Sequence, residues 1–186
     1  MHIVLWRRLD TEGHDACRYF EMPDGWKIEG TAVFKHGDSA ASLRYPLLCD
    51  STWTSQSAVV SGWIAERRFD LNIEREADDQ WRINGLLDAD MAGLGDIDLG
   101  FIPASNTNAI QRLDLSEGAK AETVAVWLDN DDWSVKRLPP SYHRTGAHTF
   151  GYASPRHDYR ATLVTDDFGA ITEYPDLWIM DRSRCA

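Results

Sequence analysis

Two pairs of aspartates, Asp88 with Asp90 and Asp96 with Asp98, have the spacing most suited to chemistry. Residues two apart on a strand share one face, so each pair could bind a divalent cation or divide the roles of acid and base. However, 30 acidic residues among 186 make such pairs common by chance. We therefore favour hydrogen-bonded loop carboxylates over a catalytic or metal-binding role.

Three histidines, His143, His148 and His157, follow one another in the last quarter of the chain. The first two would lie on opposite faces of a strand unless Gly146 provides a turn between them, so we expect exposed or hydrogen-bonded imidazoles. The sequence lacks the nucleophile-elbow, phosphate-loop and zinc-protease patterns. It accordingly predicts no catalytic residue, no metal and no cofactor.

Amide and hydroxyl side chains crowd the segment 96–113. Asn106, Asn108 and Arg112 are its groups best suited to bind sugar hydroxyls or a polar head group, because they offer several donors and acceptors. We expect a loop here, with a short helix after Pro103. The alternative interpretation is a turn or lid whose polar side chains bond only to its own backbone.

The charge balance and the cysteines limit the setting and the partners. A net charge of −11 argues against nucleic acid and against an anionic membrane surface as partners. Cys17, Cys49 and Cys185 are too few and too scattered for a disulfide framework, and we expect the first two to be small apolar residues in strands. The N-terminus lacks a secretory pattern and no apolar run spans a membrane, so we expect a cytoplasmic protein.

Alternation of apolar and polar residues dominates the chain. From Trp26 to Phe34 the even positions are apolar and the odd ones mostly polar, as in a half-buried antiparallel strand. Turn residues such as Pro23-Asp24-Gly25 separate these runs. We expect one all-β domain over 1–186 with about ten to twelve strands, and little helix besides a second short candidate over 116–122.

Aromatic residues make up 11% of the chain. They could form a packed sheet core, or they could line an apolar cavity inside a curved sheet, and periodicity does not distinguish the two. The residues that could line such a cavity are Trp26, Phe34, Trp63, Trp81, Trp127 and Tyr152.

The run from Asp98 to Thr107, followed by Ile110-Gln111-Arg112-Leu113, resembles the signature of the putative glycolipid-binding family of bacterial proteins. Trp6-Arg7 near the start and Leu177-Trp178 near the end agree with it, so the resemblance spans about residues 2 to 180. It implies an all-β spiral β-roll or half-barrel, similar to the lipoprotein carriers of the bacterial Lol pathway, and a role in binding a glycolipid.

Residues and resemblance together predict a binding protein for a glycolipid or another amphipathic small molecule. The ligand would lie in an aromatic-lined concave sheet with the polar segment at its rim. The predicted site comprises Trp63, Trp81, Trp127, Tyr152, Asn106, Asn108 and Arg112.

Two alternative functions stay open. One is a hydrolase of a sugar or lipid ester that uses Asp96, Asp98 or one of the three histidines. The other is an interaction module, with a possible homodimer, that pairs through a sheet edge or an aromatic patch.

Overall fold

The computed structural model describes residues 1–154 and 158–181, and these residues form mainly strands. The elements in chain order are β1 (His2–Arg8), β2 (Gly13–Met22), β3 (Gly25–His36), β4 (Ser39–Asp50), β5 (Ser55–Ile64), β6 (Arg67–Arg75), β7 (Trp81–Ile83), β8 (Leu86–Asp88), the 3-10 helix η1 (Ala89–Met91), β9 (Asp96–Leu99), α1 (Ala104–Leu113), β10 (Lys120–Glu122), β11 (Ala125–Asp129), β12 (Ser134–Leu138), β13 (Ser141–Gly146), β14 (Thr149–Ser154), β15 (Tyr159–Thr165), β16 (Ile171–Tyr174) and β17 (Trp178–Met180).

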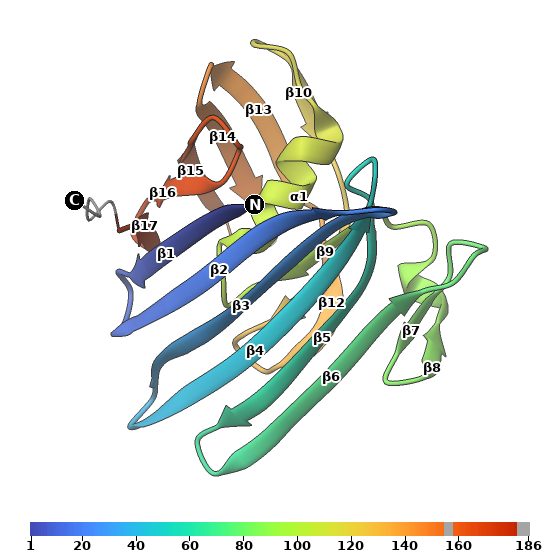
Figure 1. Cartoon of the computed structure of the whole chain (residues 1–186), viewed down its shortest axis with the longest axis vertical. Helices are drawn as coiled ribbons and strands as arrows, with labels where there is room; N and C mark the ends of the chain where they lie inside the picture. The colour runs from blue at the N-terminus through green and yellow to red at the C-terminus, as the bar shows by residue number, and fades with distance from the viewer. Residues whose placement is uncertain (155–157, 182–186) are drawn as a thin grey trace.

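One large antiparallel sheet carries the fold (Figure 1). Its fourteen strands follow the order β10-β13-β14-β15-β16-β17-β1-β2-β3-β4-β5-β6-β7-β8, so the last strand pairs with the first and the sheet continues in both directions. The outermost strands β10 and β8 do not pair with each other, and the sheet is a half-barrel rather than a closed barrel. The predicted all-β class and curved antiparallel sheet are therefore confirmed.

The number of strands and one helix differ from expectation. The described residues form seventeen strands instead of ten to twelve, because β7, β8, β10 and β17 have three residues each and show little alternation. The helix expected after Pro103 is present as α1. The helix expected over 116–122 is wrong: Gly118 has a φ of 84°, and the chain after it pairs as β10 with β13.

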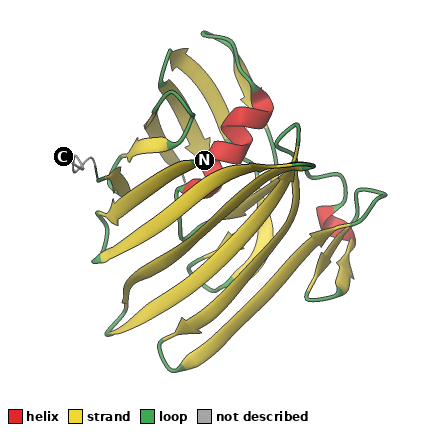
Figure 2. Ribbon diagram, viewed as in Figure 1, coloured by secondary structure: helices red, strands yellow, loops and turns green. Residues whose placement is uncertain are grey.

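The concave side of the large sheet is filled by other elements (Figure 2). A small sheet of order β12-β11-β9 lies there with α1, and β9 is tied to β5 because the Ser55 amide donates to the Gly95 carbonyl over 2.9 Å. The Ile97 amide in turn donates to Ser55 Oγ over 3.0 Å. Because all residues from Ala104 to Ile110 are buried, α1 is an internal helix and not a loop at the rim.

The polar side chains of α1 are anchors inside the core. Thr107 Oγ1 lies 3.1 Å from the Tyr19 hydroxyl, and Asn108 Nδ2 donates to Ser55 Oγ over 3.2 Å. Since a buried polar group costs free energy unless it is hydrogen-bonded, these partners offset much of the cost of burying a helix rich in Asn, Ser and Thr. Asn108 Oδ1 is buried without a hydrogen-bond partner among the described residues.

Most aromatic rings also belong to the core. Trp6 and Trp81 have no exposed surface. The Trp26 ring stacks on Trp53 at a centroid distance of 4.5 Å, and Phe34 stacks on Trp133 at 6.4 Å. Inward-pointing rings therefore fill most of the concavity. No helix in the described part of the chain has the length and apolarity needed to cross a membrane.

Candidate functional site

A cleft between the small sheet and the C-terminal strands combines aromatic and carboxylate side chains. Its volume is about 260 Å³. The walls come from β9, the connection to α1, the turn after β11, and strands β14 to β17. The lining residues are Asp98, Gly100, Ile102, Asn106, Trp127, Asp129, Asn130, Asp131, Leu138, Tyr152, Ser154, Tyr159, Tyr174, Leu177 and Trp178.

Asp98 is the carboxylate that β9 contributes to the lining of this cleft. Ser105, at the start of α1, donates its hydroxyl to Asp98 Oδ1 over 3.1 Å and accepts the Leu99 amide over 3.0 Å. Asp98 Oδ2 has no hydrogen-bond partner among the residues that the structure describes. Loss of water contact raises the pKa of Asp98 to about 6, with a smaller upward contribution from Asp96, while the Ser105 hydrogen bond lowers it.

A cluster of tyrosines forms one wall. The Tyr152 ring meets Tyr142 and Tyr174 edge-on, at centroid distances of 5.3 and 5.9 Å. The Tyr142 hydroxyl donates to Asn106 Oδ1 over 3.0 Å, which fixes the orientation of that amide. Burial raises the pKa of Tyr142, Tyr152 and Tyr174, so all three phenols are neutral at neutral pH.

Gly100 leaves room for the opposite wall. A Cβ atom at this position would lie 2.6 Å from Trp127 Nε1, 2.8 Å from the Leu128 carbonyl and 3.0 Å from Asn130 Oδ1. Any side chain here would push the Trp127 indole or the backbone aside. The glycine therefore allows β11 and the turn after it to approach the β9–α1 connection closely.

The cleft is acidic. Three aspartates line it, and no lysine, arginine or histidine is among its described lining residues. Asp129 is already used, because Lys136 Nζ lies 2.7 Å from its Oδ2 and the Asp131 amide donates to its Oδ1. The Asn130 amide and the Asp131 carboxylate have no side-chain partner in the described ranges, so they can bind a ligand.

The structure brings together three of the seven predicted site residues. Asn106, Trp127 and Tyr152 line the cleft. Trp63 points outward from β5 and is 45% exposed. Trp81 is fully buried and donates its indole N–H to the Leu94 carbonyl over 3.1 Å.

The other two predicted residues have structural partners. Asn108 bonds to Ser55 in the core. The Arg112 guanidinium forms a two-pronged ion pair with Asp96, at 2.7 and 2.5 Å, and also donates to Thr123 Oγ1 over 3.0 Å. These contacts join the end of α1 to β9, and they place Arg112 away from the cleft.

The groups considered for a hydrolase are not assembled. Asp96 is paired with Arg112, and His148 lies 3.4 Å from Asp167 at the surface. His143 is an exposed residue of β13, and His157 lies outside the described residues. Within 1–154 and 158–181 no group of three His, Cys, Asp or Glu side chains could hold a metal ion.

Sequence reasoning missed the C-terminal half of the cleft, namely Tyr159, Tyr174 and Trp178. Tyr174 and Trp178 face each other as a paired position of β16 and β17. Tyr159 and Tyr174 are also in ring contact, at a centroid distance of 6.0 Å. The signal available in the sequence was the concentration of tyrosines after Tyr142, but only the packing of the small sheet against the large one brings them into one cleft with β9.

Comparison with known proteins agrees with the fold. A crystal structure of a DUF1089 family protein from Pseudomonas aeruginosa superimposes with a TM-score of 0.77, at 23% identity, over 88% of this chain and 90% of that one. No curated protein matches the chain. The model of the family described as "Putative glycolipid-binding" matches residues 3–179, almost the whole length. The chain therefore belongs to the putative glycolipid-binding family.

Proposed function

We propose that the cleft binds the sugar head group of a glycolipid. The observation that carries the proposal is that Asp98, whose Oδ2 has no partner among the described residues, lines the same cleft as Trp127, Tyr152 and Tyr174. A sugar ring presents C–H groups on its faces and hydroxyls around its edge. Aromatic walls suit the faces, and an unpaired carboxylate oxygen suits a hydroxyl donor.

The size of the cleft supports a head group rather than a whole lipid. Its volume of about 260 Å³ lies just below the roughly 300 Å³ at which sites for drug-sized ligands begin. The space accommodates one sugar ring but not a long acyl chain in addition. The apolar part of the ligand would then lie toward solvent, along the half-buried lining residues Tyr159 and Leu177.

The charge of the cleft narrows the class of head group. Asp98 and Asp131 line it without a cationic partner among the described residues, whereas Asp129 is paired with Lys136. A sulfated or phosphorylated sugar would meet like charges there and be disfavoured. We infer that the ligand carries uncharged or amino-substituted sugars.

The test compares short-chain probes that share an octyl tail. Isothermal titration with n-octyl β-D-glucopyranoside, kept below its micellar concentration, is expected to show saturable binding, and octyl sulfate is expected to show none. Methyl β-D-glucopyranoside should bind more weakly at the same site. Asp98→Asn should weaken glucoside binding by at least about tenfold, because a hydrogen bond to a charged group contributes roughly 1.5–3 kcal/mol.

Asp15→Asn is the matched control. Asp15 is also a strand aspartate with a raised pKa, more deeply buried than Asp98, and it lies outside the cleft. There it accepts from the Tyr45 hydroxyl over 2.6 Å. The control should bind the glucoside as the unmodified protein does. Equal binding by the Asp98 and Asp15 variants, or equal binding of octyl sulfate and octyl glucoside, would contradict the proposal.

A further inference from the structure

The outward side chains of strands β1 to β5 form a surface, which we call the outer face, that differs from the rest of this acidic protein. Alternation along each strand identifies its members. The large apolar members are Ile3, Leu5, Phe20, Met22, Val33, Pro46, Leu48, Val59 and Trp63, the basic ones are Arg7, Arg18, Lys27, Lys35 and Arg44, and the acidic ones are Glu29 and Asp50.

The apolar residues of the outer face are unusually exposed. Ile3 is 67% exposed, Val33 50% and Trp63 45%. Strand register places them in rows with basic residues, since Ile3 pairs with Arg18 across β1 and β2. Single exposed apolar residues are ordinary on protein surfaces, but a patch of them that extends over several strands marks an interaction site.

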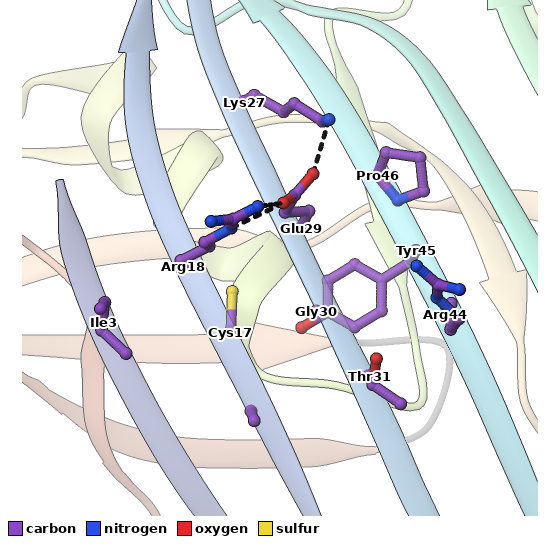
Figure 3. A pocket seen from close by; sticks show the side chains of 11 residues that line it. Ile3, Cys17, Arg18, Lys27, Glu29, Gly30, Thr31, Arg44, Tyr45 and Pro46 are labelled. Atoms are coloured by element: carbon purple, nitrogen blue, oxygen red, sulfur yellow. Dashed lines mark hydrogen bonds and ion pairs between the residues drawn. The ribbon is translucent and has the colours of Figure 1, made fainter.

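The basic residues give this face a positive charge. Five basic and two acidic members make +3, against −11 for the whole chain. Arg18 and Lys27 both pair with Glu29, the latter at 2.5 Å, as Figure 3 shows. Both acidic side chains of the outer face therefore have partners within the protein: Glu29 has these two ion pairs, and Asp50 accepts the Thr52 amide over 2.8 Å.

Three cations of the outer face remain available. Arg7, Lys35 and Arg44 form no ion pair with any residue in the described ranges, and all three are exposed. Arg44 lies across the hollow from Arg18 in Figure 3. Unpaired cations on a face with exposed apolar groups are complementary to a surface that is both apolar and anionic.

Two adjoining hollows connect the basic and apolar parts. The first, of about 470 Å³, is lined by three basic residues and one acidic residue, namely Arg18, Lys27, Arg44 and Glu29, among others. The second, of about 520 Å³, is lined mainly by the apolar residues Phe20, Met22, Leu48 and Val59. Lys27 and Pro46 line both, so a basic hollow continues into an apolar one.

We propose that the outer face docks the protein onto the surface of a bilayer that contains anionic phospholipids. Phosphate groups would occupy the hollow beside Arg18, Lys27 and Arg44, and acyl chains would contact Phe20, Met22 and Val59 in the adjoining one. Apolar and aromatic groups interspersed with Lys and Arg are the combination that binds the interface of an anionic membrane. The negative charge of the whole chain does not oppose this, because screening confines the attraction to the nearest groups.

A bilayer fits the outer face better than another macromolecule. Nucleic acid would leave the exposed Ile3, Val33 and Trp63 without partners, because its outer surface is phosphate and sugar. An acidic protein could satisfy the cations, but the apolar members spread over strands β1 to β5 favour an extended apolar surface over a single anchoring side chain.

The experiment is co-sedimentation of the full chain with vesicles that contain no sugar lipid, so its outcome is independent of the cleft. With about 30% phosphatidylglycerol in phosphatidylcholine, the protein is expected to sediment at about 0.05 M salt and to be released at about 0.5 M. With phosphatidylcholine alone it should remain in the supernatant. Arg44→Glu combined with Lys35→Glu should reduce sedimentation at least about tenfold, since each basic group near an anionic surface raises the membrane-binding constant severalfold.

Arg160→Glu is the matched control, because Arg160 is an exposed residue of β15 and lies outside the outer face. It should sediment as the unmodified protein does. The conservative pair Arg44→Gln with Lys35→Gln, expected to give an intermediate loss, covers the case in which charge reversal prevents folding.

Several outcomes would overturn the proposal. They are equal sedimentation with neutral and anionic vesicles, no sedimentation with either, and a double variant that binds like Arg160→Glu. Displacement of the protein from vesicles by soluble glycerol phosphate would indicate a site for a free phosphate ester instead. Light scattering that shows a dimer abolished by Val59→Asp would indicate that a second copy covers the face.

Discussion

The Ser105 hydroxyl donates to Asp98 Oδ1 over 3.1 Å and so links the first turn of α1 to the lining of the cleft. The same hydroxyl accepts the Leu99 amide, which makes Ser105 a fixed junction between strand and helix. Asp98 is therefore held with one oxygen bound and the other without a partner among the described residues. This arrangement suits a half-buried carboxylate to the recognition of a ligand hydroxyl.

Glucoside binding should depend on pH through Asp98. Burial raises the pKa of this carboxyl to about 6, so the ionised form that accepts a ligand hydroxyl dominates above pH 6 and is lost below it. Titration with octyl glucoside should give an affinity that is constant at higher pH, falls as pH drops through about 6, and levels off in acid at the affinity of the Asp98→Asn variant. Ser105→Ala should move the midpoint upward, because the Ser105 hydrogen bond lowers the pKa of Asp98. An unchanged midpoint in this variant would argue against Asp98 as the titrating group.

Substitution at Gly100 should close the cleft. A Cβ there would lie 2.6 Å from Trp127 Nε1 and 2.8 Å from a backbone oxygen, and overpacking of this kind destabilises by about 1–3 kcal/mol. Gly100→Ala should lower the melting temperature and abolish glucoside binding. At Gly151 an added Cβ meets its nearest atoms at 3.7 Å, so Gly151→Ala should retain binding. Retained affinity in Gly100→Ala would show that the ligand does not occupy the space beside Trp127.

Loss of the Arg112 guanidinium should destabilise the fold and not the cleft. Asp96 is 2% exposed and depends on Arg112 and Thr123 for its partners. Removing one member of a buried ion pair costs about 3–5 kcal/mol. Arg112→Ala should therefore lower the free energy of unfolding by that amount, as measured by chemical denaturation. At a temperature where the variant is folded it should bind octyl glucoside normally. A variant with unchanged stability and lost binding would reverse the assignment and make Arg112 a ligand residue.

Asp15 should make stability fall as pH rises. Its pKa is raised to about 7 by burial, against 3.8 in an unfolded chain, so the folded state holds the proton more tightly. The contribution of Asp15 to the free energy of unfolding is therefore most favourable below pH 4, declines as the pH rises to 7, and is constant at higher pH. Asp15→Asn should raise the unfolding free energy at pH 8 by up to a few kcal/mol, at about 1.4 kcal/mol per pKa unit. The gain should disappear near pH 4, and an equal gain at both pH values would contradict titration of Asp15 as the cause.

Much of the fold was predictable from local pattern. The alternation from Trp26 to Phe34 and the turn at Pro23-Asp24-Gly25 mark β3 and the hairpin before it. The three-residue strands were not predictable, because they are defined by their partners and not by their own residues. The family resemblance supplied the half-barrel, which periodicity alone does not distinguish from a flat or closed sheet.

The candidate site was predictable only in part. Trp127 and Tyr152 share the cleft because β11 and β14 both contribute to its walls. Trp63 is a tryptophan like Trp127, but it lies on the outward face of the large sheet. The polar residues of α1 resemble a ligand-binding loop in sequence, yet Asn108 and Thr107 are bonded to core partners. A polar cluster indicates hydrogen bonding, and only the structure decides between the protein and a ligand as the partner.

The most direct test of sugar binding in the cleft is a ¹⁵N–¹H NMR titration that follows the indole N–H signals of the tryptophans with octyl glucoside. We predict saturable shifts of Trp127 and Trp178, with Trp63 and the core residue Trp81 unchanged. Shifts of Trp63 without those of Trp127 and Trp178 would place the ligand on the outer face and contradict the cleft as the sugar-binding site.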